Sequence, residues 1–310
     1  MTLYRSILMF TEVLNFDRAP VSPAVHFSYA HQGQSRFRRS LIRTVETLTG
    51  QPKLRRLYVD WAICDKRPGE PVFSAALRKL QIVPKITVGE EHLGAVPKTG
   101  GLLLVANHPF GVVDGLAIGH LGLQLRDNVK ILTNSLLCRV PEVEPYLLPV
   151  DFSGTAEARR LTAETRRQAA ALLAAGKVVA VFPAGGVATA NKPLQGRAVD
   201  APWHPFIGRL ATIPEVTTMP VHFAGQNSRL FQVASHTSYP LRVALIFHET
   251  RRRIGRPVEM RLGAPVSAET LGQLNRDAVA ADLRRRCMLL AAPRLDDPDE
   301  TYIWPRHIKW

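Results

Sequence analysis

A short apolar run at residues 102–106 limits what this chain can fold into, because such a run is typical of a strand buried in a sheet. It leads directly into residues 107–116, which read Asn-His-Pro-Phe-Gly-Val-Val-Asp-Gly-Leu, and then into a helical pattern at 115–125. A second apolar run, at 177–182, has the character of a strand buried on both faces. These segments predict a strand that ends in a tight turn and continues into a helix.

The turn carries a histidine and an aspartate. His108 and Asp114 are six positions apart, so a continuous helix would separate them by about 240° around its axis. Gly111 permits a turn between them, and Pro109 fixes a torsion directly after the histidine. We therefore expect His108 on the loop and Asp114 in the first turn of the following helix, where the helix dipole favours a carboxylate. An imidazole held near a carboxylate is suited to removing a proton from a hydroxyl. The alternative is that His108 caps a turn and Asp114 caps a helix.

The remaining pattern alternates strands with helices. We expect strands at 82–88, 102–106, 129–133, 146–150, 177–182, 216–223, 241–248 and 258–262, and helices at 115–125, 134–139, 156–175 and 268–290. This order predicts an α/β fold with a mixed, largely parallel central sheet flanked by helices. We divide the chain into an irregular and basic amphipathic helical segment at 1–80, an α/β domain at 81–290 and a tail at 291–310.

Composition, cysteine spacing and the length of apolar runs indicate where in the cell the protein is located. The chain has 310 residues, of which 46% are hydrophobic and 21% charged, so a sizeable core is expected. Its three cysteines are far apart, which argues against a disulfide framework or a zinc site. No apolar run reaches the roughly 18 to 20 residues that span a bilayer, and Glu12 interrupts the partly apolar start. We expect a cytoplasmic protein on the inner face of the cell membrane.

The charge balance points to an anionic partner. Lysine and arginine number 40 against 26 aspartates and glutamates, a net charge of +14. Residues 35–80 interleave basic and aromatic side chains, so this segment either lies on an anionic membrane or forms a solvated helix face. The charge is dispersed and no known nucleic-acid module is present, which argues against nucleic acid as a partner.

Four polar turns follow expected strands, and loops at the carboxyl ends of strands gather into one crevice. The sequence has no Gly-x-Ser-x-Gly elbow, phosphate-binding loop, His-Glu-x-x-His or Rossmann fingerprint. The candidate catalytic residues are therefore His108 and Asp114, and the candidate substrate-binding residues are Asn107, Gly111, Gly115, Asn134, Phe182, Pro183, Gly185, Gly186, Asn227, Ser228 and Arg229. For Asn227 and Ser228 a simple turn is an equal alternative.

The blocks at 107–115 and 182–187 resemble the signature of the lysophospholipid (glycerolipid) acyltransferase superfamily. Within it, the chain is most similar to the bacterial lyso-ornithine-lipid acyltransferases and hemolysin-like proteins. The resemblance extends over about 35–290. Further agreement lies at 46–50, 130–134, 148–151, Trp203, 209–211, 225–228 and Phe231.

The resemblance implies an O-acyltransferase. His108 would be the general base for a lyso-lipid hydroxyl, and Asp114 would orient its imidazole. The acyl donor would be the thioester of acyl carrier protein (ACP) or acyl-CoA, with no metal or cofactor. Backbone N–H groups near Gly185 and Gly186 would face an oxyanion or bind a phosphate.

Two departures bear on the acceptor. The spacing is His-x5-Asp where the superfamily usually has His-x4-Asp, and its usual Phe-Pro-Glu-Gly-Thr-Arg block is Phe-Pro-Ala-Gly-Gly-Val here. Val187 cannot replace the arginine associated with an acceptor phosphate. This favours an amino-acid lipid such as lyso-ornithine lipid, unless Arg209 or Arg229 supplies a cation. The alternatives are a lysophosphatidate acyltransferase and a non-catalytic lipid- or membrane-binding protein.

Overall fold

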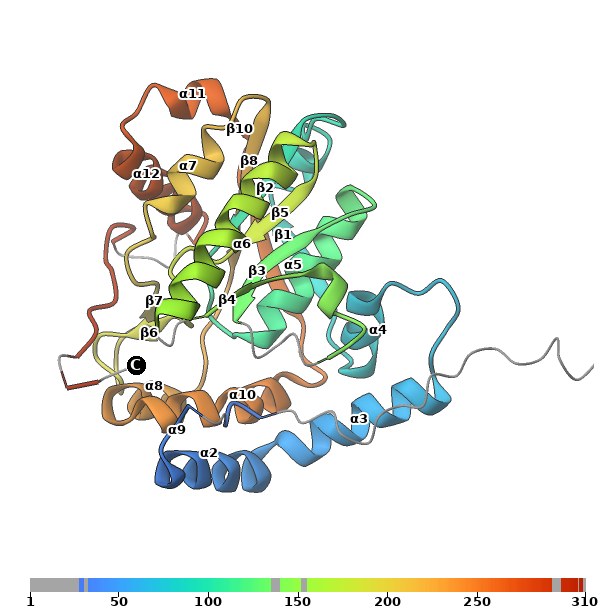
Figure 1. Cartoon of the computed structure of the whole chain (residues 1–310), viewed down its shortest axis with the longest axis vertical. Coiled ribbons are helices and arrows are strands. Elements are labelled where there is room, and N and C mark those ends of the chain that lie inside the picture. The colour runs from blue at the N-terminus through green and yellow to red at the C-terminus, as the bar shows by residue number, and fades with distance from the viewer. Residues whose placement is uncertain are drawn as a thin grey trace, which may run out of the picture.

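The computed structural model describes residues 28–30, 33–134, 140–151, 155–291, 297–305 and 307–308. Its centre is a sheet with strand order β1-β9-β8-β2-β5-β3-β4, and β10 pairs with β8 (Figure 1). The strands of this sheet are β1 (Pro84–Val88), β2 (Gly101–Ala106), β3 (Lys130–Asn134), β4 (Leu147–Val150), β5 (Val178–Val181), β8 (Val216–Phe223), β9 (Val258–Leu262) and β10 (Val266–Ser267). The short strands β6 (Thr189–Ala190) and β7 (Ala198–Val199) form a separate pair.

Helices cover both faces of the sheet (Figure 1). They are α2 (Arg36–Thr49), α3 (Gln51–Cys64), α4 (Val72–Lys79), α5 (Val112–Leu125), α6 (Ala156–Ala174), α7 (Phe206–Ala211), α8 (Arg229–Thr237), α9 (Tyr239–Ala244), α10 (Ile246–Arg253), α11 (Ala268–Gly272) and α12 (Arg276–Leu289), with 3-10 turns η1 (Glu90–Leu93) and η3 (Glu144–Tyr146).

The expected α/β architecture is confirmed. Strands β8, β2, β5, β3 and β4 run parallel to one another, and β1 runs parallel to β9. The β9 strand is antiparallel to β8, as is β10, so the sheet is mixed but largely parallel. The carboxyl ends of the five parallel strands therefore lie at one edge.

Strand β2 is buried from end to end, which explains its uninterrupted apolar sequence. Leu102 and Leu104 pack in a core cluster with residues of α4 and α5. Leu103 and Val105 point to the other face, into a cluster with residues of α6, α7 and α12. The alternation of a pleated strand places successive side chains in these two cores.

Gly50 separates α2 from α3. An added Cβ at Gly50 would lie 2.5 Å from the carbonyl oxygen of Phe247, so glycine allows close approach to α10. Helix α2 packs against α9 and α10, and Ile42 joins a small core with Ala244 and Phe247. In Figure 1, α2 and α3 run along one side of the molecule, next to α8, α9 and α10.

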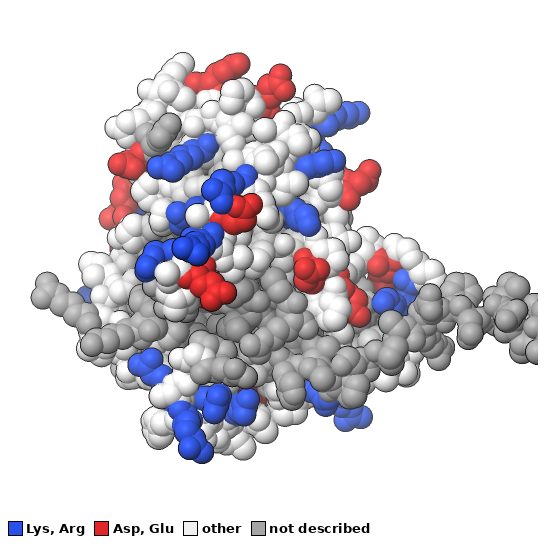
Figure 2. All heavy atoms as spheres, viewed as in Figure 1, with Lys and Arg blue, Asp and Glu red and all other residues white. Residues whose placement is uncertain are grey.

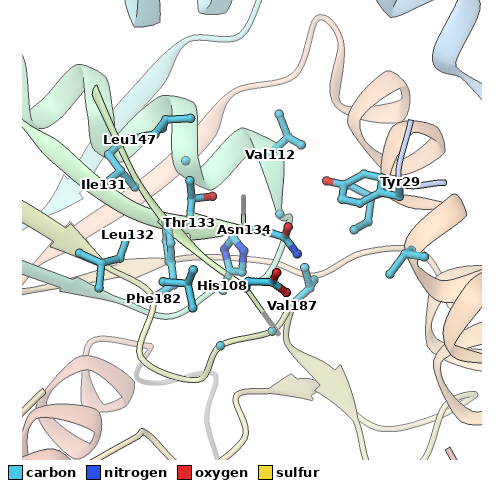
Figure 3. A pocket seen from close by; sticks show the side chains of 18 of the residues that line it. Tyr29, His108, Val112, Ile131, Leu132, Thr133, Asn134, Leu147, Phe182 and Val187 are labelled. Carbon is cyan, nitrogen blue, oxygen red and sulfur yellow. The ribbon is translucent and has the colours of Figure 1, made fainter. Parts of the chain in front are cut away.

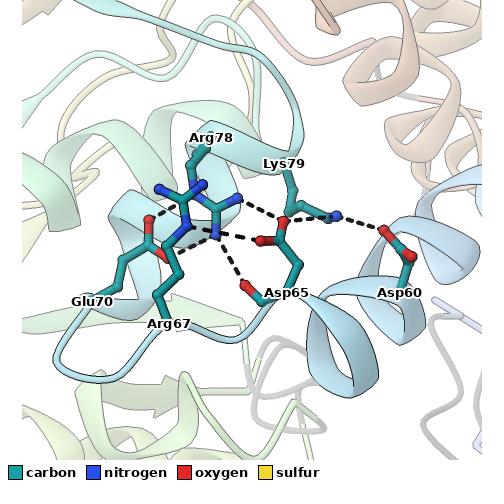
Figure 4. Close-up of polar contacts among 6 residues, drawn as sticks. All are labelled: Asp60, Asp65, Arg67, Glu70, Arg78 and Lys79. Carbon is teal, nitrogen blue, oxygen red and sulfur yellow. Dashed lines mark hydrogen bonds and ion pairs between the residues drawn. The ribbon is translucent and has the colours of Figure 1, made fainter.

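A cluster of charged side chains fixes the connection from α3 to α4 (Figure 4). Arg78 binds Asp65 at 2.6 Å and Glu70 at 2.8 Å, and Lys79 binds Asp60 at 2.5 Å. Hydrogen bonds from Arg78 and then Lys79 lower the pKa of the Asp65 carboxyl to about 2. This cluster has a complete set of partners, so its role is to hold α4 in place.

The prediction of a strand at 241–248 is wrong, because this segment forms α9 and α10. A short apolar run does not distinguish a strand from a buried helix. Here Ala244 and Phe247 are three residues apart and contact the same cluster, a spacing that fits a helix.

The other differences are smaller. The helix expected at 268–290 is divided into α11 and α12, since Asn275 caps a new helix start. Of the helix expected at 134–139, Asn134 instead ends strand β3, and 135–139 lie outside the described residues. The domain boundaries near 80 and 290 stay a prediction.

Among the described helices, none combines the length and the apolar character that crossing a bilayer requires.

Candidate active site

The turn after β2 brings His108 and Asp114 together. Nδ1 of His108 lies 3.1 Å from Oδ2 of Asp114. The chain reverses at Gly111, whose φ of 82° belongs to a region that side-chain-bearing residues rarely adopt. Helix α5 begins at Val112, so Asp114 sits in its first turn, as the sequence predicted.

The carboxylate of Asp114 is fully buried and held by backbone donors. Its Oδ2 accepts hydrogen bonds from the N–H groups of Phe110 at 2.8 Å and Gly111 at 3.0 Å. These two donors and the helix N-terminus favour a negative charge at this position. A fixed buried carboxylate beside Nδ1 orients the imidazole and stabilises it when it gains a proton.

The imidazole of His108 lines a cavity and is otherwise held by an aromatic ring. It stacks on Phe182, with ring centroids 4.1 Å apart and an interplanar angle of 27°. Figure 3 shows it among the lining side chains, near Asn134 and Val187. Because Nδ1 faces Asp114, Nε2 is the nitrogen that can meet a substrate.

The main chain of His108 is fixed by two contacts from distant segments. Its N–H donates to Oδ1 of Asp200 at 3.2 Å. Its carbonyl accepts from the N–H of Ala188 at 2.7 Å. The backbone of the histidine is therefore tied to the segments before β6 and after β7.

Asp200 is a second buried carboxylate, and the sequence analysis did not identify it. Its Oδ2 accepts a hydrogen bond from Nε1 of Trp203 at 2.9 Å. Burial raises the pKa of the Asp200 carboxyl to about 6, despite the opposing effect of the bonds from Trp203 and His108. The signal was an Asp three residues before a Trp, but nothing local links that pair to His108.

The cavity has a volume of about 1390 Å³, larger than a typical small-ligand pocket. His108, Val187 and the turn 182–186 line one part of it. Another part is apolar and is formed by side chains of α3, α4, α5 and β3 with the segment before β4. These apolar residues include Leu54, Leu57, Trp61, Val72, Phe73, Ala76, Leu116, Ile131, Val143 and Leu147.

The structure brings most predicted site residues to this cavity. Its lining includes Gly111, Gly115, Asn134, Phe182, Pro183, Gly185 and Gly186 as well as His108. Asn107 does not line it, because its side-chain amide pairs with the backbone of Phe223. Nδ2 donates to the carbonyl at 3.0 Å and Oδ1 accepts from the N–H at 2.7 Å. Asn107 thus joins β2 to β8 just before the histidine.

The predicted site residues that follow β8 lie outside the cavity lining. Ser228 caps α8 and donates to Glu249, and Asn227 is buried. Arg229 donates to the carbonyl of Gly196 at 2.6 Å. Arg209 is not among the lining residues either. The structure therefore does not bring Asn227, Ser228, Arg229 or Arg209 to the substrate side of His108.

The two glycines after β5 differ in their hydrogen bonding. The N–H of Gly185 donates to the carbonyl of Phe182 at 3.0 Å and closes the turn. Within the described part of the chain, the N–H of Gly186 has no acceptor. Gly186 therefore retains a backbone donor that a ligand in the cavity can use.

Among the cations of the cavity lining that were not predicted as site residues is Arg242 of α9. It lies in the segment expected to be a strand, where an arginine within an apolar run was the available signal.

Among the residues that the structure describes, no group of three or more His, Cys, Asp or Glu side chains is placed to hold a metal ion.

The pKa of Asp200 gives a prediction for stability. The folded carboxyl is protonated near pH 6 and an unfolded aspartate near about pH 3.9, so folding takes up a proton between these values. As pH falls from 6 to 4, the free energy of unfolding of the native protein should rise relative to Asp200→Asn by about 1 kcal/mol per pH unit. Denaturant titrations of both proteins measure this, and a difference that is constant from pH 7 to pH 4 would contradict it.

Comparisons with known proteins identify relatives of this chain and its family. Over 137 residues, or 44% of the chain, it is 28% identical to the lyso-glycine lipid O-acyltransferases of Phocaeicola vulgatus and Bacteroides thetaiotaomicron. The matched part spans about half of these relatives, 46% and 47% of their lengths. A family model described as acyltransferase matches residues 62–273, more than half of the chain, including both His108 and the turn after β5. The chain belongs to this acyltransferase family.

Proposed function

We propose that this protein transfers a fatty acyl group from a carrier thioester to the hydroxyl of a lyso-lipid with an amino-acid headgroup. The observation that carries the proposal is the His108–Asp114 pair, which lies at a cavity with a long apolar part. The similar proteins are O-acyltransferases of lyso-glycine lipid, which supports an amino-acid lipid as acceptor. Lyso-ornithine lipid belongs to the same chemical class.

In the proposed reaction, Nε2 of His108 takes the proton of the acceptor hydroxyl as its oxygen attacks the thioester carbonyl. The buried carboxylate of Asp114 stabilises the imidazolium that forms. The tetrahedral intermediate then collapses, the C–S bond breaks, and the imidazolium returns its proton to the departing thiolate. The products are an ester and a free thiol. The proton that His108 removed from the hydroxyl ends on the thiol, and His108 is neutral again.

The developing oxyanion needs a donor at its position. The N–H of Gly186 fits this role, since it follows the turn against which His108 stacks and has no acceptor in the described part of the chain.

The apolar part of the cavity would hold a fatty acyl chain. Phe73 and Ala76 of α4, Leu116 of α5 and Ile131 of β3 line this part. Removal of apolar surface from water drives such binding.

For the donor, we propose a thioester whose phosphate lies near α6. Arg166 and His204 line the cavity, with Nη2 of Arg166 3.4 Å from Nε2 of His204. Burial, then the positive charges of Arg166 and Arg209, lower the pKa of His204. The guanidinium of Arg166 favours an anion here, which ACP and CoA both carry as the phosphate of their pantetheine arm.

We further propose that the protein acts on an anionic membrane surface. Figure 2 shows basic side chains at the lower edge of the molecule, over α2 and the start of α3. Arg36, Arg43 and Arg56 are exposed there, and Phe37 and Leu48 each keep 77% of their surface accessible. Exposed aromatic and aliphatic groups among arginines suit a lipid headgroup region.

Two alternative functions would require different features of the site. Arg209 and Arg229, the two arginines that the sequence offered for an acceptor phosphate, do not line the cavity. A non-catalytic lipid-binding protein has no need for a buried carboxylate at Nδ1 of a cavity-lining histidine. The geometry therefore favours catalysis, and the similarity to lyso-glycine lipid O-acyltransferases favours an amino-acid lipid as the acceptor.

Replacement of the base tests catalysis. His108→Ala should lower the rate of thiol release from an acyl thioester plus lyso-lipid by about 10²–10⁴-fold, because the hydroxyl loses its proton acceptor. Asp114→Asn should also lower it, since the amide cannot stabilise the imidazolium. Thiol release is measured with acyl-ACP and with acyl-CoA, which also identifies the donor.

The matched control is His92→Ala, because His92 belongs to η1 and does not line the cavity. It should retain the native rate. Near-native thiol release by His108→Ala would exclude the proposed mechanism, and thiol release by none of the proteins would favour the lipid-binding alternative.

Chain-length selectivity tests the apolar part of the cavity. Ala76→Phe fills space there, so the kcat/KM for a sixteen-carbon donor should fall by about tenfold or more, while that for an eight-carbon donor changes by less than about threefold. Equal losses with both donors would show that the chain binds elsewhere. Leu230→Ala, an exposed site on α8 outside the cavity, is the control.

Vesicle binding tests the membrane surface. The native protein should co-sediment with vesicles that contain anionic lipid, and binding should weaken as salt rises. A variant with Arg36, Arg43 and Arg56 changed to Glu should lose most of this binding, by about 1 kcal/mol or more per reversed charge. Undiminished binding would contradict a role for α2 and α3.

A further inference from the structure

Arg242 is a buried cation beside the cavity. Its residue is only 3% exposed, and Nη1 donates to Oγ1 of Thr189 and to Oγ of Ser235, both at 2.6 Å. Nη2 donates to the carbonyl of Val187. The guanidinium also lies over the rings of Phe231 and Trp304, with distances to the ring centroids of 5.0 and 4.9 Å. These contacts place the guanidinium firmly in one position.

The charge of Arg242 has no counter-ion in the described part of the chain. No carboxylate there lies within ion-pair distance of it, and its oxygen partners are hydroxyls and a carbonyl. Burial lowers the pKa of Arg242 to about 10, so it stays protonated at neutral pH. Neutral oxygens satisfy its N–H groups but leave a full positive charge in a poorly solvated place, which is unfavourable unless an anion joins it.

Arg242 is linked to the base through a single peptide group. The carbonyl of Val187 accepts from Arg242, and the N–H of Ala188, in the same peptide group, donates to the carbonyl of His108. Val187, Arg242 and His108 all line the cavity. One acceptor molecule can therefore reach both residues, with its hydroxyl at His108 and an anionic group at Arg242, if the part of the molecule between these two groups is short.

We propose that Arg242 is a specificity residue that binds the carboxylate of the amino-acid headgroup of the acceptor. This inference rests on the proposed function. A glycine joined to a lipid through its amine keeps its carboxylate, and a guanidinium matches a carboxylate in shape and charge. The turn 185–187 carries no cation of its own, so Arg242 supplies the charge from another element.

Equilibrium binding without any thioester tests this inference separately from catalysis. The probes are an N-(hydroxyacyl)glycine, its methyl ester, and CoA. Each probe is titrated into the native protein, into Arg242→Met and into Arg242→Lys. The native protein should bind the free acid at least about tenfold more tightly than the ester, as expected for a charge-assisted hydrogen bond. Arg242→Met should bind both probes alike, and Arg242→Lys should keep part of the preference.

Three outcomes overturn the proposal: equal binding of acid and ester by the native protein, an unchanged preference in Arg242→Met, or a loss confined to CoA, which would assign the anion to the donor phosphate. The first comparison needs no variant, so it holds even if Arg242→Met does not fold. Arg285→Met is the control, because Arg285 is an exposed arginine of α12 outside the cavity. Failure of the proposed function would show instead as absent thiol release when a thioester is added.

Discussion

The contact between His108 and the buried carboxylate of Asp114 is the interaction on which the site depends. A carboxylate out of reach of water needs donors in place of its lost hydration, and here the N–H groups of Phe110 and Gly111 supply them at Oδ2. Those donors exist because the chain reverses at Gly111 and starts a helix there. The turn that buries the charge is thus the same turn that brings the histidine to it.

The rest of the fold holds this turn from several directions. Strand β2 enters it from the middle of the sheet, packed on both faces. Asn107 fastens the strand end to Phe223, and Asp200 binds the main-chain N–H of His108. Phe182 supports the imidazole from the turn after β5. Segments far apart in the sequence therefore fix both the backbone and the ring of one histidine, which suits the proposed role of His108 as a general base.

What the sequence predicted well was local. The apolar runs of β2 and β5, the reversal at Gly111 and the place of Asp114 in a first helical turn follow from periodicity and backbone chemistry within about fifteen residues. The strand predicted at 241–248 failed because its apolar residues suit a buried helix equally, and only contact with Ile42 of α2 decides between them. The role of Asn107 as a link between strands was likewise hidden, because its partner lies 116 positions away.

The same limit explains the two charged groups that were missed. Asp200 and Arg242 act on His108 and its surroundings through contacts that no local pattern encodes. Arg229 and Asn227 followed a buried strand as the candidate pattern required, yet the chain after β8 turns into α8, away from the cavity lining. Position at the end of a parallel strand is thus a useful indication of a site, but the path of the following loop decides which side chains reach it.

We propose that this site passes an acyl group from a thioester to a lipid hydroxyl. The most direct measurement is the stoichiometry of products when purified protein, an acyl thioester and an N-(hydroxyacyl)glycine are mixed, with free thiol and acylated lipid quantified together. If the proposed acyl transfer occurs, one new ester forms on the acceptor hydroxyl for each thiol released. Thiol released as free fatty acid, with no acylated lipid, would contradict it.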